Sequence, residues 1–368
     1  MPARPLRRLA LAALLLVATV TPGHATEDAR LLRMPDLHGE RIVFVKGGDL
    51  WTVARTGGTA QRLTSHPGLE SFPKFSPDGT QIAFTGEYDG NPDVYVMPVT
   101  GGAPRRLTFH PGNDQVTEWY PDGKALLVRG NRTSPFLRLD QFSRLPLNGG
   151  LTEPLPLWSA GYAGFSEDGR QLAFVSPQSD RRLWKRYRGG NAADIFLYDF
   201  ASKTSENVTH DWVGPDEWPM FHGRTMYYVS DRDGHTANLW AYDLDRRTHQ
   251  RITSFTEFDV KWPSIGPDGI VFENGGALWV MDLPSERLHP LHVTLPDDQS
   301  DIRPRYRNVA AFIGGCDLAP SGQRAVIEAR GDLFTLSPEP RTARNLTRTP
   351  GARDRDPAWS PDGQWLAY

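Results

Sequence analysis

Short apolar stretches recur along the chain after residue 40, and turn-forming residues separate them. Three kinds of stretch follow one another: an apolar stretch, a stretch with a central aromatic residue, and a short stretch that ends in threonine. The first kind lies at 81–84, 126–128, 171–175 and 226–229, the second at 49–53, 93–97, 194–198, 238–242, 277–281 and 332–336, and the third at 62–64, 106–108, 207–209, 251–253 and 345–347. Runs of this length and composition are typical of buried strands. The pattern therefore predicts an all-β protein.

A turn motif precedes these sets of strands. Its fullest form is Phe-Ser-Pro-Asp-Gly at 75–79, and related forms lie at 120–123, 165–169, 265–269, 319–322 and 359–363. Proline presets φ in such a turn, and glycine accepts the positive φ that the turn requires. The aspartates Asp78, Asp122 and Asp168 are spaced by 44 and 46 residues, a period typical of propeller blades. We interpret these aspartates as turn formers rather than catalytic residues.

The strand sets predict two domains. Sets begin near 41, 81, 124, 170, 224 and 269, which predicts a six-bladed β-propeller over 32–295. A polar stretch at 296–301 is typical of a linker, and the pattern restarts near 307. Residues 296–368 are therefore expected to begin a second propeller. Its last strand stops at Tyr368, so we expect the chain to be a fragment. The alternative is a single propeller of seven or eight blades.

The first 25 residues have the features of a secretory signal peptide. Arg4, Arg7 and Arg8 precede an apolar run at 9–20. The small residues Gly23 and Ala25 follow, at the positions −3 and −1 of the expected cleavage site. The run is shorter than the roughly 20 residues that span a bilayer, which disfavours a membrane anchor. We therefore expect cleavage after Ala25, a periplasmic or secreted protein, and no membrane association afterwards.

Charge and composition narrow the function classes. The net charge is −3, with basic and acidic residues mixed along the chain, so no nucleic-acid partner is expected. A single cysteine, Cys316, excludes an intrachain disulfide. The sequence contains no Gly-x-Ser-x-Gly, His-Glu-x-x-His or phosphate-binding loop motif. We predict no catalytic residue, no metal site and no cofactor within this chain.

Two segments carry residues suited to peptide contact. In the basic segment 181–190, Trp184, Arg186 and Arg188 could meet peptide carboxylates through guanidinium groups and an aromatic face. The alternative is a structural loop, with the arginines paired to the protein itself and Trp184 covering a blade edge. The segment 212–219 contains Trp212 and Trp218, which either line a mouth or pack between blades.

Longer stretches resemble the N-terminal half of tricorn proteases. They lie at 34–45, 48–51, 184–190, 303–309 and 329–334, and the likeness extends from about residue 32 to 368. The resemblance implies a six-bladed TolB-like propeller, a second and seven-bladed one, and then a helical segment, a PDZ domain and a serine-peptidase core of the S41 type. It also implies that the propellers filter oligopeptides, that the full protein forms a homo-oligomer, and that the catalytic residues lie outside this chain.

One feature of the tricorn proteases has no counterpart in this sequence, and alternative functions stay open. An arginine pair that anchors the substrate's C-terminus in the best-known member has no counterpart at 110–115. We expect this chain to be an inactive, substrate-gating part of a peptidase whose substrates are peptides. One alternative is a stand-alone TolB-like propeller that binds proteins without catalysis. Another is a propeller attached to a hydrolase of the prolyl oligopeptidase type.

Overall fold

The computed structural model describes residues 28–132, 139–148, 150–177, 186–234, 236–296, 308–339, 343–349 and 351–368. These residues form two compact units, which divide at residue 297. The predicted signal peptide 1–25 and Trp184 lie outside the described residues. No helix among the described residues is long and apolar enough to cross a membrane.

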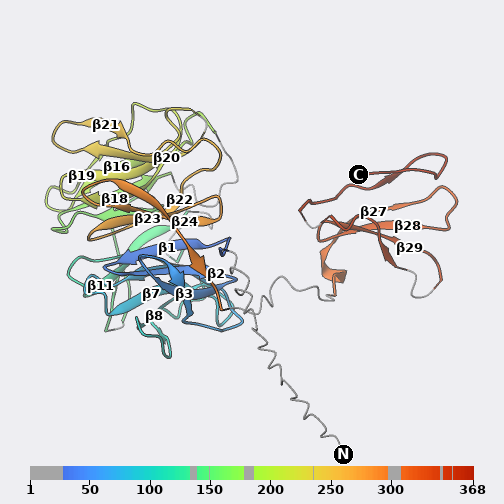
Figure 1. Ribbon diagram of the computed structural model, residues 1–368, viewed down its shortest axis with the longest axis horizontal. Helices are drawn as coiled ribbons and strands as arrows, with labels where there is room; N and C mark the ends of the chain where they lie inside the picture. The colour runs from blue at the N-terminus through green and yellow to red at the C-terminus, as the bar shows by residue number, and fades with distance from the viewer. Residues whose placement is uncertain are drawn as a thin grey trace, which may run out of the picture. The chain divides into compact units, whose positions relative to one another are not determined.

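Each four-stranded sheet of the first unit is built from strands that follow one another closely in the chain (Figure 1). The described residues of this unit form six such sheets, all antiparallel: β1 (Arg33–His38), β2 (Arg41–Lys46), β3 (Asp49–Ala54) and β5 (Gln61–Arg62); β6 (Glu70–Phe75), β7 (Gln81–Gly86), β8 (Asp93–Pro98) and β9 (Arg105–Arg106); β10 (Asp114–Trp119), β11 (Ala125–Gly130), β12 (Gln141–Pro146) and β13 (Glu153–Pro154); β14 (Ala163–Phe165), β15 (Gln171–Ser176), β16 (Asp194–Asp199) and β17 (Thr204–Asn207); β18 (Asp216–His222), β19 (Thr225–Ser230), β20 (Asn238–Asp243) and β21 (Thr248–Arg251); β22 (Lys261–Gly266), β23 (Gly269–Asn274), β24 (Ala277–Asp282) and β25 (Arg287–Leu291).

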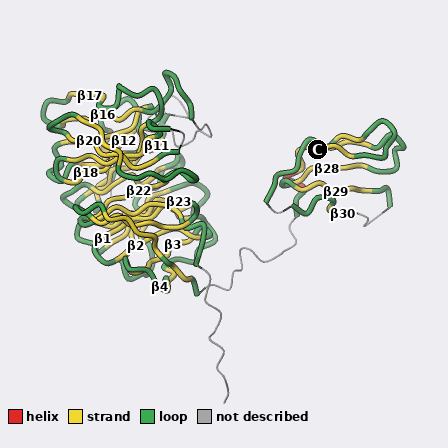
Figure 2. The backbone as a smooth tube through the Cα atoms, turned by 45° about the horizontal axis from the view of Figure 1, so that its top comes forward, coloured by secondary structure: helices red, strands yellow, loops and turns green. Residues whose placement is uncertain are grey.

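The first strands of these sheets surround a common axis. β1 contacts β6, β6 contacts β10, β10 contacts β14, β14 contacts β18, β18 contacts β22, and β22 contacts β1. Figure 2 shows the same stacked sheets from another side, with strands in yellow. The fold is therefore an all-β propeller, as the strand pattern predicts. The predicted blade number of the complete domains stays a prediction.

The apolar core lies between neighbouring sheets. Val43 and Leu50 of the first sheet pack with Ile82 and Phe84 of the second, and all four side chains are fully or almost fully buried. Each boundary has a cluster of this kind because one blade cannot bury both of its own faces. Apolar side chains therefore point to both faces of the middle strands, which explains why these strands appear as continuous apolar runs.

The first and last sheets join at a seam. The two-residue strand β26 (Val293–Thr294) pairs in parallel with β4 (Gly58–Thr59). The backbone N–H of Ala29 donates to the carbonyl of Val293 at 2.7 Å. β1 also packs against β22 and β23. Among the described residues, the ring is thus closed by packing and a short pairing, without an exchanged strand within a four-stranded sheet.

The turn motif has one structure in the copies that carry a serine two residues before the aspartate. The hydroxyl of Ser76 donates to the carboxylate of Asp78, which also accepts the N–H of Thr80 at 3.1 Å. These hydrogen bonds, of which the bond from Ser76 has the largest effect, hold the pKa of Asp78 below its usual value. Ser166 with Asp168 and Ser360 with Asp362 repeat the arrangement. The aspartates close turns in this structure, as the motif predicts.

The second unit repeats the sheet pattern. It contains η1 (Ala310–Phe312), one sheet of β27 (Ile313–Leu318), β28 (Ala325–Ala329), β29 (Asp332–Leu336) and β30 (Arg344–Asn345), and a two-stranded sheet of β31 (Ala358–Trp359) and β32 (Leu366–Ala367). Val326 and Leu333 are fully buried inside it.

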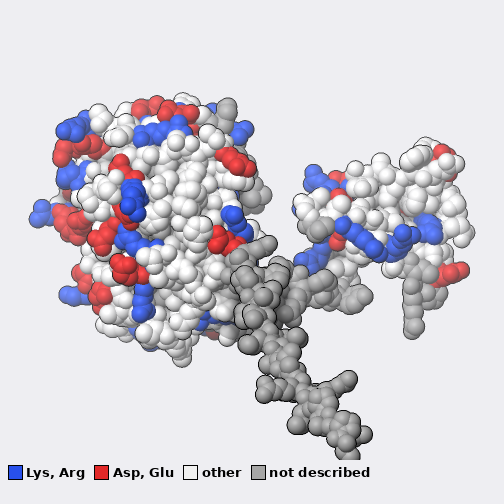
Figure 3. Space-filling view, in the orientation of Figure 1, with Lys and Arg blue, Asp and Glu red and all other residues white. Residues whose placement is uncertain are grey.

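Charged side chains are mixed over the surface. On the face of the first unit seen in Figure 3, Lys and Arg side chains alternate with Asp and Glu side chains. Many are paired, as in the contact of Arg55 with Asp282 at 2.7 Å. This distribution agrees with the mixed charge of the sequence.

Candidate functional site

The basic segment predicted to contact peptide is only partly described. Arg186 is exposed. The Nη1 atom of Arg188 lies 2.9 Å from a carboxylate oxygen of Asp231, and its guanidinium lies 4.9 Å from the ring centre of Trp212. Trp212 donates its indole N–H to the same aspartate at 3.1 Å. Arg188 therefore ties its loop to the residue after β19, and a role of Arg186 or Arg188 in peptide binding stays a prediction.

A vestibule opens at one end of the axis. Its volume is about 540 Å³, within the range of roughly 300–1,000 Å³ typical of ligand pockets. Every first strand or the turn after it contributes a lining residue: His38, Ser76, Trp119, Ser166, His222 and Pro267. The vestibule is thus centred on the axis and belongs to all six four-stranded sheets that the structure describes in the first unit.

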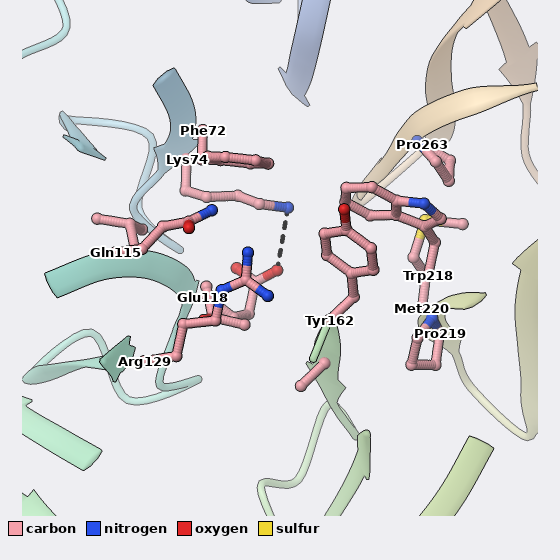
Figure 4. A pocket seen from close by; sticks show the side chains of 13 residues that line it. Phe72, Lys74, Gln115, Glu118, Arg129, Tyr162, Trp218, Pro219, Met220 and Pro263 are labelled. Atoms are coloured by element: carbon pink, nitrogen blue, oxygen red, sulfur yellow. Dashed lines mark ion pairs between the residues drawn. The ribbon is translucent and has the colours of Figure 1, made fainter. Parts of the chain in front are cut away.

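The passage narrows next to the vestibule. A smaller cavity of about 40 Å³ shares the lining residues Glu118, Pro219 and Met220 with the vestibule. Figure 4 shows two unlike walls around it. One side, which we call the polar wall, is formed by Phe72, Lys74, Gln115, Glu118 and Arg129. The other side, which we call the aromatic wall, is formed by Tyr162, Trp218, Pro219, Met220 and Pro263. We call this cavity the constriction.

The polar wall contains a buried network that joins four sheets. Lys74 Nζ lies 3.2 Å from Glu118 and 3.7 Å from Asp36, and donates to the hydroxyl of Ser264 at 2.6 Å. Burial raises the pKa of Asp36 to about 6, although Lys74 opposes the shift. Burial by itself lowers the pKa of Lys74, but Glu118 and Asp36 outweigh it and the pKa lies above its usual value. The network holds β1, β6, β10 and β22 together at the axis.

The aromatic wall is a stacked pair. The rings of Tyr162 and Trp218 have centroids 3.3 Å apart and planes at 19°. The guanidinium of Arg129 lies 5.3 Å from the ring centre of Tyr162. Arg129 is 2% exposed, and its buried charge over the face of the ring favours one position of the tyrosine.

Four first strands share a backbone feature that the sequence analysis missed. Met34, Phe72, Trp218 and Trp262 have positive φ angles of 48°, 50°, 60° and 47°. Each lies where the register to the next strand shifts, as in a β-bulge. Each also precedes a proline, and this recurring dipeptide is the signal that could have been noticed. The bulge brings Phe72 and Trp218 to the constriction.

Comparisons with known proteins agree with this architecture. Residues 29–287 match the family described as the tricorn protease N-terminal β-propeller domain. The chain belongs to this family. A tricorn protease homolog of Saccharolobus solfataricus is 28% identical over 336 residues, which cover 89% of this chain and 30% of the relative. Tricorn protease homolog 1 of Streptomyces coelicolor is 30% identical over 343 residues, 92% of this chain and 32% of the relative.

A solved structure supports the fold of this tricorn-family chain. The crystal structure of the tricorn protease superimposes with a TM-score of 0.70 at 24% identity, covering 87% of this chain and 31% of that one. The chain therefore spans about a third of the length of these relatives. The resemblance found from the sequence is confirmed, and the relatives are named as proteases. The segment 110–115 covers the loop before β10 and the first two residues of this strand, and its Gln115 lines the constriction on the side opposite to the aromatic wall.

Proposed function

We propose that this chain is the substrate-filtering propeller part of a tricorn-type serine peptidase that degrades oligopeptides. The observation that carries the proposal is the axial passage, in which a vestibule of about 540 Å³ leads to a constriction of about 40 Å³. A passage of this shape excludes folded proteins, and its vestibule has the volume of a ligand pocket. The peptidase centre, of the S41 type, would lie in a part of the protein beyond this chain, and the full protein would assemble as a homo-oligomer.

The size of the native protein tests the existence of a catalytic part. An antibody raised against this chain would be used on a periplasmic extract of the source cells. A band far larger than 41.2 kDa supports a peptidase parent. A band at or just below that mass favours the stand-alone binding propeller instead. The purified chain alone should hydrolyse no peptide, and hydrolysis free of contaminants would contradict the proposal.

A substitution in the vestibule tests the filter. His222 lines the vestibule at the end of β18, so His222→Trp would narrow the entrance. In the full-length protein, hydrolysis of long peptides should fall several-fold while that of a dipeptide-sized chromogenic substrate stays unchanged. His210→Trp is the control, because His210 is exposed and does not line the vestibule. Equal loss on both substrates would argue against a filtering role.

Export through the signal segment is part of the proposal. The basic start, the apolar run at 9–20 and the small residues up to Ala25 support cleavage and a periplasmic or secreted location. N-terminal sequencing of the native protein should begin at Thr26. A protein that retains Met1 and stays in the cytoplasm would contradict this part of the proposal.

A further inference from the structure

The constriction is bounded by side chains from several sheets (Figure 4). Lys74 lies on β6 and Glu118 on β10, whereas Trp218 lies on β18. The width between the two walls therefore depends on how the sheets pack around the axis, and no single loop controls it. A cavity of about 40 Å³ has room for about three water molecules, at roughly 10–15 Å³ each. A side chain much larger than alanine does not fit unless a wall moves.

The polar wall offers little basis for selection by charge. The ammonium of Lys74 is already engaged by Glu118, Asp36 and Ser264. A buried pair that loses one partner is strongly destabilised, so these contacts would not open readily for a peptide. The part of this wall formed by Lys74 therefore distinguishes peptides by size and shape.

The aromatic wall is held in place on several sides. Trp218 has a φ of 60°, which is strained for a bulky residue and persists only where the surroundings impose it. A Cβ atom at Gly164 would lie 2.5 Å from the carbonyl oxygen of Pro219, so the backbones of β14 and β18 are in close contact. Tyr162 covers one face of the indole. Trp218 is therefore a fixed wall rather than a hinged lid.

We infer that Trp218 determines which peptide side chains can occupy the constriction. Glycine, alanine and serine fit the cavity between Trp218 and the polar wall, whereas leucine and phenylalanine do not. This inference rests on the proposed peptide-filtering function and adds to it a preference for peptides of small residues.

Binding of matched peptides to the full chain tests the inference. The probes are acetylated and amidated alanine heptapeptides whose central residue is alanine, leucine or phenylalanine, and calorimetry measures their affinities. Trp218→Gly removes the wall and accepts the positive φ without strain. Trp218→Phe keeps a ring. Trp365→Gly is the control, because Trp365 is 73% exposed in the second unit. Thermal unfolding confirms that each variant is folded. If Trp218→Gly does not fold, Tyr162→Ala replaces it, because this substitution widens the same cavity.

The expected result is a change in discrimination. The wild-type chain and Trp365→Gly should bind the alanine peptide roughly tenfold more tightly than the phenylalanine peptide, as for a pocket that rejects extra volume. Trp218→Gly should bind both peptides alike, and Trp218→Phe should lie between. An unchanged ratio in Trp218→Gly, or tighter wild-type binding of the phenylalanine peptide, would overturn the inference while leaving the proposed function intact. If no heptapeptide binds the wild type, both fail.

Discussion

The side-chain hydroxyl of Thr108 accepts a hydrogen bond from the backbone N–H of Val94 at 3.0 Å. Fourteen residues separate the partners, and the same contact joins Thr64 to Leu50, Thr209 to Ile195, Thr253 to Leu239 and Thr347 to Leu333. The hydroxyl of Thr108 also donates to the carboxylate of Asp93 at 2.8 Å. In these five repeats the terminal threonine thus fastens the fourth strand to the start of the third.

Removing this hydroxyl should destabilise the blade. In Thr108→Val the N–H of Val94 and the carboxylate of Asp93, both buried, lose a partner. The free energy of unfolding should fall by about 1–3 kcal/mol, the cost of an unsatisfied buried group. Urea unfolding measures it. Thr256→Val is the control, because Thr256 is exposed, and it should stay within about 0.5 kcal/mol of the wild type.

The close approach of the first and last sheets should not tolerate a side chain at Gly266. A Cβ atom there would lie 2.3 Å from the carbonyl oxygen of Leu37. Gly266→Ala should therefore force β22 away from β1 and lower the free energy of unfolding by about 1–3 kcal/mol or more. Gly190→Ala, where a Cβ atom meets nothing within 4 Å, is the matched control. Urea unfolding measures the effect, and similar unfolding midpoints for both variants would contradict a tight contact between β1 and β22.

Stability should depend on pH through Glu70. Burial raises the pKa of Glu70 to about 7, although hydrogen bonds from Tyr88 and Thr64 oppose the shift. The folded protein holds this proton more tightly than the unfolded chain, so its contribution to stability is complete below pH 4.5 and is lost as the pH rises through 7. Glu70→Gln should reduce this fall between pH 4.5 and 7. Urea midpoints across this range measure it, and an identical pH profile in the variant would contradict the assignment.

Arg188→Ala distinguishes the two interpretations of the basic segment. The carboxylate of Asp231, which is 5% exposed, accepts hydrogen bonds from the side chains of Arg188 and Trp212. In the variant it would keep only the bond from the indole N–H of Trp212. The free energy of unfolding should fall by about 1.5–3 kcal/mol, the range for hydrogen bonds to charged groups. The affinity for peptides should be unchanged if the role of Arg188 is structural. A loss of peptide affinity without a loss of stability would instead support substrate contact.

The repeat pattern was sufficient to predict the strands, the turns and the propeller class, because these follow from local physics. Pro-Asp-Gly turns, alternating polar ends and apolar strand interiors depend on neighbours in the chain. The motif around Asp78 even indicated the role that the hydrogen bonds of Ser76 and Thr80 assign to it. The longer stretches were specific enough to indicate the family.

The constriction could not be predicted in the same way. A residue before proline normally adopts an extended backbone, so the recurring pair marks the position of Trp218 without predicting its φ of 60°. Arg129 lies on β11, Tyr162 directly before β14, and Trp218 on β18, and only closure of the ring brings them together. Lys74 likewise meets Ser264, 190 residues away in the chain. The sequence by itself determined the blades, because their strands and turns are local. The tertiary structure decided the width and chemistry of the passage, because these depend on contacts between sheets.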